Sequence, residues 1–196
     1  MSHYIYHTEG IVLGSFNVEE SSRFLQIFTR DLGLVGAKAQ GLRELKSKLR
    51  YSLQDFYHSR IDFVRGKDIW RITNASKKDS YNNLLDNGEK LKIFAELLFF
   101  VRRLVVGEEK SKEIFDFLLN SALFLDKKDL NETQLKSFLL ISEIRILYYL
   151  GYFDPKENFL PFVGFSVWTQ AILDNFISVE KEAKIAIETS LEFSHL

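Results

Sequence analysis

The sequence predicts an α+β chain, with an N-terminal five-stranded β-barrel followed by an α-helical domain. Up to about residue 73, short segments rich in β-branched and aromatic residues alternate with turn residues, which is typical of strands. After Tyr81, apolar residues recur at spacings of three and four, as on the face of a helix. The charge balance also changes near residue 80. We therefore expect one domain over residues 1–80 and a second over 81–196.

Five short segments in the first half predict strands, and glycine, asparagine or aspartate residues separate them. Closure removes the exposed edges of so small a sheet, which favours a closed or partly open barrel. Hairpin turns are expected at residues 31–33 and 65–67. The predicted strands are Gly10–Ser15, Phe24–Thr29, Leu34–Ala39, Phe56–Val64 and Asp68–Thr73.

Helical periodicity covers most of the second half. The clearest helix begins after Asn131, which is followed three residues later by Gln134, a pattern that predicts a capping box. Gly151 is suited to the left-handed position that follows the last turn of this helix. The other predicted helices are Leu91–Val105, Lys112–Leu125, Val167–Ile177 and Val179–Glu192.

The composition excludes several kinds of chemistry. The chain of 196 residues contains no cysteine, which rules out disulfides, thiolate zinc sites, iron–sulfur clusters and cysteine nucleophiles. Its four histidines show no metal-binding spacing, and no phosphate-binding glycine loop or GxSxG motif occurs. We therefore predict no enzyme, cofactor or metal. A structure that placed His58 beside carboxylates in a cleft would instead favour a hydrolase or transferase.

No targeting or membrane segment is expected. Residues 1–6 lack a basic region followed by an apolar stretch. The longest apolar run, Leu97–Val101, is far shorter than the roughly 20 residues of a spanning helix. The sequence therefore predicts a cytoplasmic protein without membrane contact.

The formal net charge of -1 is the sum of two unlike halves. Residues 1–80 carry 13 basic against 9 acidic side chains, whereas residues 81–196 carry 13 against 18. The segment Lys38–Lys78 carries 11 against 4 and includes aromatic residues such as Tyr51 and Trp70. Cations on a polar connection with aromatic faces nearby are typical of single-strand nucleic-acid binding. Chance clustering, or a solvated loop beside core aromatics, explains the same residues, and these interpretations stay open.

Motifs in both halves resemble those of the bacterial recombination mediator RecO family. Six short motifs of the first half follow one another in the family's order and spacing. In the helical half, Glu143-x-Arg145-x-Leu147 leads into the Leu-Gly-Tyr sequence at 150–152, similar to the family's FELRLL and LGY motifs. The first-half motifs are TEGIVL at 8–13, Glu20 with Arg23, and residues 28–34, 37–41, 46–49 and 53–56.

The resemblance implies an oligonucleotide/oligosaccharide-binding (OB) fold followed by a helical domain, and no chemistry on DNA. RecO proteins bind single- and double-stranded DNA and anneal complementary strands. They contact the acidic C-terminal tail of single-strand binding protein and act with RecR to load RecA. The expected partners are therefore DNA, RecR, this acidic tail and, indirectly, RecA. The alternative is an OB-fold adaptor that binds proteins without binding DNA.

Eight basic residues are predicted to contact DNA. Lys38, Lys46 and Lys48 match basic positions of the family motifs, whereas Arg43 and Arg50 are added on local charge alone. The full set is Arg23, Lys38, Arg43, Lys46, Lys48, Arg50, Arg65 and Lys67. The residues predicted to bind a partner's acidic tail are Arg102, Arg103, Lys136 and Arg145. Solvation, or an ion pair within the chain, explains each of these four equally well.

The sequence departs from the family pattern at several positions. Many members carry a four-cysteine zinc module after the LGY motif, but residues 153–165 here contain no cysteine. We therefore expect the module to be absent and predict no zinc. Gln40 replaces a usual lysine, Leu42 a small residue and Asp55 a proline. Each change reduces positive charge or backbone rigidity, which bears on the strength of DNA binding.

Overall fold

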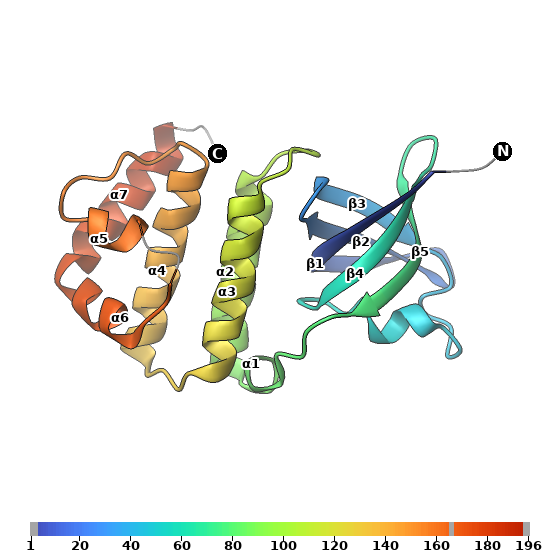
Figure 1. Cartoon of the computed structure of the whole chain (residues 1–196), viewed down its shortest axis with the longest axis horizontal. Helices are drawn as coiled ribbons and strands as arrows, with labels where there is room; N and C mark the ends of the chain where they lie inside the picture. Colours follow the sequence, from blue (N-terminus) through green and yellow to red (C-terminus); the bar gives the residue numbers. More distant parts are fainter. Residues whose placement is uncertain (1–3, 165–166, 194–196) are drawn as a thin grey trace. The chain divides into compact units, whose positions relative to one another are not determined.

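A computed structural model describes residues 4–164 and 167–193, and Figure 1 shows its strands and helices. His3, His195 and Phe165 lie outside the described residues. The chain divides into two compact units. The first contains the residues up to Ser80 together with Val105–Phe115, and the second contains the remaining residues from Tyr81 onward. The segment Val105–Phe115 therefore groups with the barrel, although it follows a helix of the second unit in the sequence.

The first unit is a closed barrel of five strands in the order β1-β2-β3-β5-β4. Neighbouring strands are antiparallel except β3 and β5, which run parallel. A small barrel of five strands in this order is an OB-fold, so the predicted fold class is confirmed. The strands are β1 (Ile5–Val18), β2 (Ser22–Thr29), β3 (Gly33–Ala39), β4 (His58–Arg65) and β5 (Trp70–Lys77), with the short 3-10 helix η1 (Lys48–Tyr51) between β3 and β4.

Alternation of inward and outward side chains builds the barrel core. In β3, Val35, Ala37 and Ala39 are fully buried, and the residues between them point outward. β1 begins earlier than the predicted strand because its first half pairs with β4 and its second half with β2. β1 therefore pairs with two strands, and its pairing with β2 shifts register between Val12 and Gly14.

The start of β3 lies against the segment Val105–Phe115. The backbone N–H of Leu34 donates to the carbonyl oxygen of Gly107 at 3.1 Å. Gly33 has a φ of +67°, and a Cβ at this position would lie 2.4 Å from the carbonyl oxygen of Glu109. Only glycine fits this backbone conformation and this close approach together.

The second unit is helical, and the predicted ends of its clearest helix are confirmed. The Asn131 side chain accepts from the Gln134 N–H at 2.9 Å, and the Gln134 side chain accepts from the Asn131 N–H at 3.2 Å. Gly151 has a φ of +76°, and the Tyr152 N–H donates to the Leu147 carbonyl at 2.8 Å, which forms a Schellman motif. The helices are α1 (Asn82–Asp86), α2 (Gly88–Leu104), α3 (Lys112–Lys127), α4 (Glu132–Tyr149), α5 (Leu160–Val163), α6 (Gln170–Phe176), η2 (Ile177–Val179) and α7 (Glu180–Phe193).

The five predicted helices are present as α2, α3, α4, α6 and α7, whereas the short α1 and α5 are additional. α6 begins three residues later than predicted because the Thr169 side chain accepts from the Ile172 N–H at 3.2 Å and caps the helix there. None of the helices in the described part of the chain is both long and apolar enough to span a membrane.

Candidate nucleic-acid interface

A row of four side chains crosses the outer face of the barrel. Phe16 of β1 lies opposite Phe24 of β2. Phe24 also lies opposite Lys38 of β3, and Lys38 lies beside Arg71 of β5. Residues paired directly across neighbouring strands lie on the same side of a sheet. We call Phe16, Phe24, Lys38 and Arg71 the outer strip.

The two rings form the apolar end of the outer strip. Their centroids are 5.2 Å apart, and Phe16 is 55% exposed. A Cβ at Gly36 would lie 2.7 Å from the Phe24 ring, so the absence of a side chain at this position lets the ring approach the backbone of β3. Exposed aromatic faces stack nucleic-acid bases without selecting a sequence. This end of the strip can therefore accept bases.

The basic end of the outer strip meets the loop between β1 and β2. Lys38 Nζ forms an ion pair with Glu19, and Arg43 Nη1 donates to the Glu20 carbonyl oxygen at 2.9 Å. The hydrogen bond and charge of Lys38 lower the pKa of Glu19 below its usual range, so this carboxylate partly neutralises the lysine. The structure therefore brings Lys38 and Arg43 to this end of the strip. Arg23 pairs with Asn17 and with the buried Ala39, so it lies on the other side of the sheet from Phe24, and its Nε is buried.

Four further predicted contacts lie on connections between strands. Lys46 is exposed on the turn after β3, and Lys48 and Arg50 are exposed on η1. Lys67 is exposed on the turn between β4 and β5. In OB-folds, oligonucleotides bind the face of the second and third strands and the loops that join strands 1 and 2 and strands 4 and 5. The outer strip and Lys67 occupy this region.

Arg65, at the end of β4, is held by an acidic residue of Val105–Phe115. Its Nη1 donates to both carboxylate oxygens of Glu108, at 2.6 and 2.8 Å. The same carboxylate accepts from Trp70 Nε1 at 2.8 Å, and Arg65 Cζ lies 4.6 Å from the centroid of the Trp70 ring. Arg65 is therefore neutralised within the first unit.

Sequence reasoning missed four residues of this region: Phe16, Phe24, Arg71 and Glu108. The alternation of β5 gives a signal for Arg71, since it follows the buried Trp70 and must point outward. The same reasoning applies to the aromatic residues of β1 and β2. Glu108 carries no such signal, because its contacts join residues about 40 positions apart in the chain.

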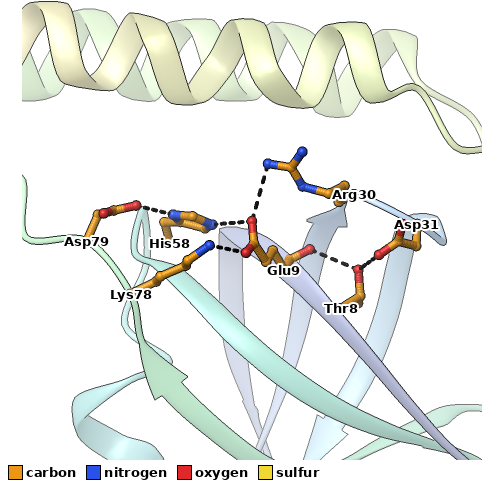
Figure 2. Close-up of polar contacts among 7 residues, drawn as sticks. All are labelled: Thr8, Glu9, Arg30, Asp31, His58, Lys78 and Asp79. Atoms are coloured by element: carbon orange, nitrogen blue, oxygen red, sulfur yellow. Dashed lines mark hydrogen bonds and ion pairs between the residues drawn. The ribbon is translucent and has the colours of Figure 1, made fainter.

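His58 lies in a polar network, shown in Figure 2, between two carboxylates. Its Nδ1 is 2.5 Å from Asp79 Oδ2, and its Nε2 is 3.5 Å from Glu9 Oε2. Glu9 also forms ion pairs with Lys78 and with Arg30, whose Nη2 lies 3.3 Å away. The network joins β1 and β4 with the residues that follow β2 and β5.

The surroundings of His58 support a structural role for this network. Burial opposes ionisation of Glu9, but Lys78, with His58 and Arg30, holds its pKa below the usual range. His58 is only 2% exposed, and the Phe115 ring packs against it at 5.9 Å. A substrate would reach the imidazole only if these residues moved. The described residues contain no group of three or more His, Asp or Glu side chains suited to a metal ion.

Comparison with known proteins supports the resemblance. Residues 1–81 match the protein-family model described as "Recombination protein O N terminal". The chain is 33% identical over 145 residues to the DNA repair protein RecO of Caldicellulosiruptor saccharolyticus, which covers 74% of this chain and 58% of that relative. It is 28% identical over 145 residues to the protein of this name from Acetivibrio thermocellus, and 30% identical over 144 residues to that from Alkaliphilus metalliredigens. The last two alignments each cover 74% of this chain and 57% of the relative.

The chain belongs to the RecO family. The match to the RecO N-terminal model covers all five strands and the whole outer strip. The chain spans less than two thirds of the length of these RecO relatives.

The four partner contacts predicted for this RecO chain lie in different environments. Arg102 and Arg103 are exposed at the end of α2. Lys136 is exposed on α4, where its Nζ lies 2.7 Å from Glu132 Oε1. Arg145 is fully buried in the helical unit, so its guanidinium is not presented at the surface.

A different part of the helical unit of this RecO chain combines apolar surface with cations. An open pocket of about 280 Å³ lies beside α3, and Phe124 and Trp168 are among its lining residues. Lys127 and Lys128, at the end of α3 and just after it, also line this pocket. Sequence reasoning missed these two lysines, because the pocket forms only when the segment containing Trp168 folds back against α3.

Proposed function

We propose that this chain is a DNA-binding recombination mediator of the RecO type and not an enzyme. It binds single- and double-stranded DNA, anneals complementary strands and, with RecR, helps to load RecA onto DNA coated by single-strand binding protein. The observation that carries the proposal is the outer strip, in which two aromatic rings and two cations share the ligand-binding face of an OB-fold. The name shared by the relatives supports a role in DNA repair.

The chemistry of the strip suits DNA of any sequence. Lys38 and Arg71 neutralise backbone phosphates, and the release of counterions makes such binding salt-dependent. Phe16 and Phe24 add stacking, which is available to unpaired bases but not to bases within a duplex. We therefore expect tighter binding to single strands than to duplexes of the same length.

A titration of labelled oligonucleotides at several salt concentrations tests the proposal. The Lys38→Glu/Arg71→Glu variant should bind single strands at least about tenfold more weakly, with a salt slope smaller by about 1.4 because two phosphate contacts are lost. The matched control, Lys92→Glu/Lys181→Glu, makes the same charge change at exposed positions of α2 and α7 and should bind like the wild type. Equal losses in the two variants would contradict the assignment of the site.

One observation favours the alternative adaptor without DNA binding. Two of the predicted phosphate contacts, Lys38 and Arg65, are already paired with carboxylates of the first unit. This adaptor predicts no oligonucleotide binding by the wild-type chain, even at low salt. The same titration therefore decides between the two functions.

The proposed partners rest on different support. The pocket beside α3 combines an apolar lining with Lys127 and Lys128, which suits the acidic tail of single-strand binding protein better than the buried Arg145 does. RecR and RecA are included on the family resemblance alone. A cytoplasmic location is likewise part of the proposal.

A further inference from the structure

Arg65 and Trp70 together form an anion-binding fork where β4 ends and β5 begins. The guanidinium donates to two oxygens of one carboxylate, at 2.6 and 2.8 Å, and the indole Nε1–H donates to one of these oxygens at 2.8 Å. Arg65 Cζ also lies 4.6 Å from the Trp70 ring centroid. A planar guanidinium and an indole N–H are both donors only, so this fork selects carboxylate or phosphate oxygens.

The chain itself fills this fork with Glu108. Burial opposes ionisation of this carboxyl group, but the hydrogen bonds from Trp70 and Arg65 and the charge of Arg65 hold its pKa below the usual range. Glu108 therefore remains an anion at neutral pH. Its carboxylate accepts the hydrogen bonds of both donors of the fork.

The ion pair between Arg65 and Glu108 lies at the surface, where an external anion can compete with Glu108 for Arg65. The side chain of Arg65 is 53% exposed and that of Glu108 is 45% exposed. Glu108 follows Gly107, whose φ is +73°, and the exposed Val106. Ion pairs exposed to this extent contribute little net stability, because water and salt screen them. Displacement of Glu108 therefore costs little.

We propose that the Arg65–Trp70 fork is a second phosphate-binding site of the barrel, and that Glu108 is an internal competitor which a DNA phosphate displaces. This inference rests on the proposed DNA-binding function and adds to it a donor, Trp70, and a residue that weakens binding. The outer strip binds DNA without this step, whereas Arg65 contributes only after Glu108 has left. Glu108 thereby lowers the affinity for DNA and the number of phosphates neutralised.

Glu108→Gln tests this, because the amide keeps the size of the side chain and an acceptor for Trp70 but removes the charge. We expect single-strand affinity to rise about two- to fivefold, the range of an exposed ion pair. The salt slope should steepen by up to about 0.7, as one further phosphate contact forms. The matched control is Glu109→Gln, which changes the net charge equally at the neighbouring exposed residue and should leave both values near those of the wild type. In an Arg65→Ala background, Glu108→Gln should give no increase.

Each other outcome overturns the inference. Equal effects of Glu108→Gln and Glu109→Gln would show a general charge effect. An unchanged affinity in Glu108→Gln, with binding still lost in Lys38→Glu/Arg71→Glu, would remove the fork and leave the proposed function intact. No DNA binding by the wild-type chain would overturn both. Should Glu108→Gln fail to fold, intrinsic fluorescence of the wild type decides: DNA must change the emission of Trp70, as assigned with Trp70→Phe, and an unchanged emission at saturation overturns the inference.

Discussion

Arg145 carries a positive charge into the core of the helical unit. It is fully buried, its Nε donates to the Phe162 carbonyl at 2.6 Å, and its Cζ lies 4.3 Å from the Trp168 ring centroid. Burial lowers its pKa to about 10, so the group remains protonated at neutral pH. We expect Arg145→Ala to lower the free energy of unfolding by about 3 kcal/mol, because it leaves a cavity and an unpaired carbonyl. Urea denaturation midpoints measure this effect.

Lys136→Ala is the control for this experiment, because Lys136 is exposed and forms only a surface ion pair with Glu132. Such a pair contributes at most about 1 kcal/mol. If Arg145 instead contacts a partner, Arg145→Ala will leave the urea midpoint unchanged and abolish binding of an acidic tail peptide.

Glu143, two residues before Arg145 on α4, makes stability depend on pH. Burial, together with the nearby charge of Glu96, raises the pKa of Glu143 to about 7 from an ordinary value of 4.5. Below pH 4.5, Glu143 is protonated in both the folded and the unfolded state, so its ionisation does not oppose folding and stability is highest there. Stability is then lost as pH rises from 4.5 through 7, because only the unfolded chain ionises freely.

Glu143→Gln should therefore raise the melting temperature at pH 8 and leave it nearly unchanged at pH 4.5. The gain at pH 8 is at most about 3.5 kcal/mol, at about 1.4 kcal/mol per pKa unit. Thermal unfolding at the two pH values measures the effect. Glu188→Gln, at an exposed position of α7, should show no such difference between the two pH values. A gain from Glu143→Gln of equal size at both pH values would point to packing instead of ionisation.

At the scale of elements, the connection between β3 and β4 carries exposed cations but none of the aromatic rings of the outer strip. Lys46 and Lys48 are exposed on its turn and on η1. Because phosphate contacts position a protein without selecting a sequence, Lys46→Glu/Lys48→Glu should weaken binding to all oligonucleotide sequences alike. The salt slope on single strands should decrease by up to about 1.4. A titration with several sequences measures this, and a loss confined to one sequence would show base recognition instead.

The ends of elements were predictable where local residues determine them. The cap at Asn131 and the left-handed Gly151 lie within the sequence pattern of α4 itself, and both predictions are confirmed. The start of β1 was not predictable in this way, because its first residues are held by pairing with β4. The short helices α1 and α5 also escaped prediction, since four or five residues are too few to show helical periodicity.

For the whole molecule, periodicity predicted the fold class because it reports the burial of neighbouring residues. The grouping of Val105–Phe115 with the barrel depends on contacts such as Leu34 with Gly107, which no local pattern encodes. The candidate site divides in the same way. Lys38 was found from charge and motif. To place its neighbour Arg71 in the site, one must know the parallel register of β3 and β5. To find Glu108, one must know that the connection after α2 contacts Arg65 at the end of β4.

The unequal division of charge over the whole chain leads to a prediction about strand annealing. Residues 1–80 carry a charge of +4 and residues 81–196 a charge of -5, so only the part that contains the barrel strands has a net positive charge to neutralise DNA. Two complementary strands repel each other through their phosphates, and neutralisation of either strand lowers that barrier. The wild-type chain should therefore accelerate annealing of dye-labelled complementary oligonucleotides at low salt, and the acceleration should disappear as salt increases.

Energy transfer between dyes on the two strands measures the annealing rate. At equal, subsaturating protein concentrations, Lys38→Glu/Arg71→Glu should anneal about tenfold more slowly than the wild type, since two phosphate contacts are reversed. The control Lys92→Glu/Lys181→Glu should retain the wild-type rate, although its net charge is the same as that of Lys38→Glu/Arg71→Glu. If the outer-strip variant annealed at the wild-type rate while binding single strands more weakly, the strip would hold DNA without bringing strands together. Annealing would then have to depend on other cations, such as those of the β3–β4 connection.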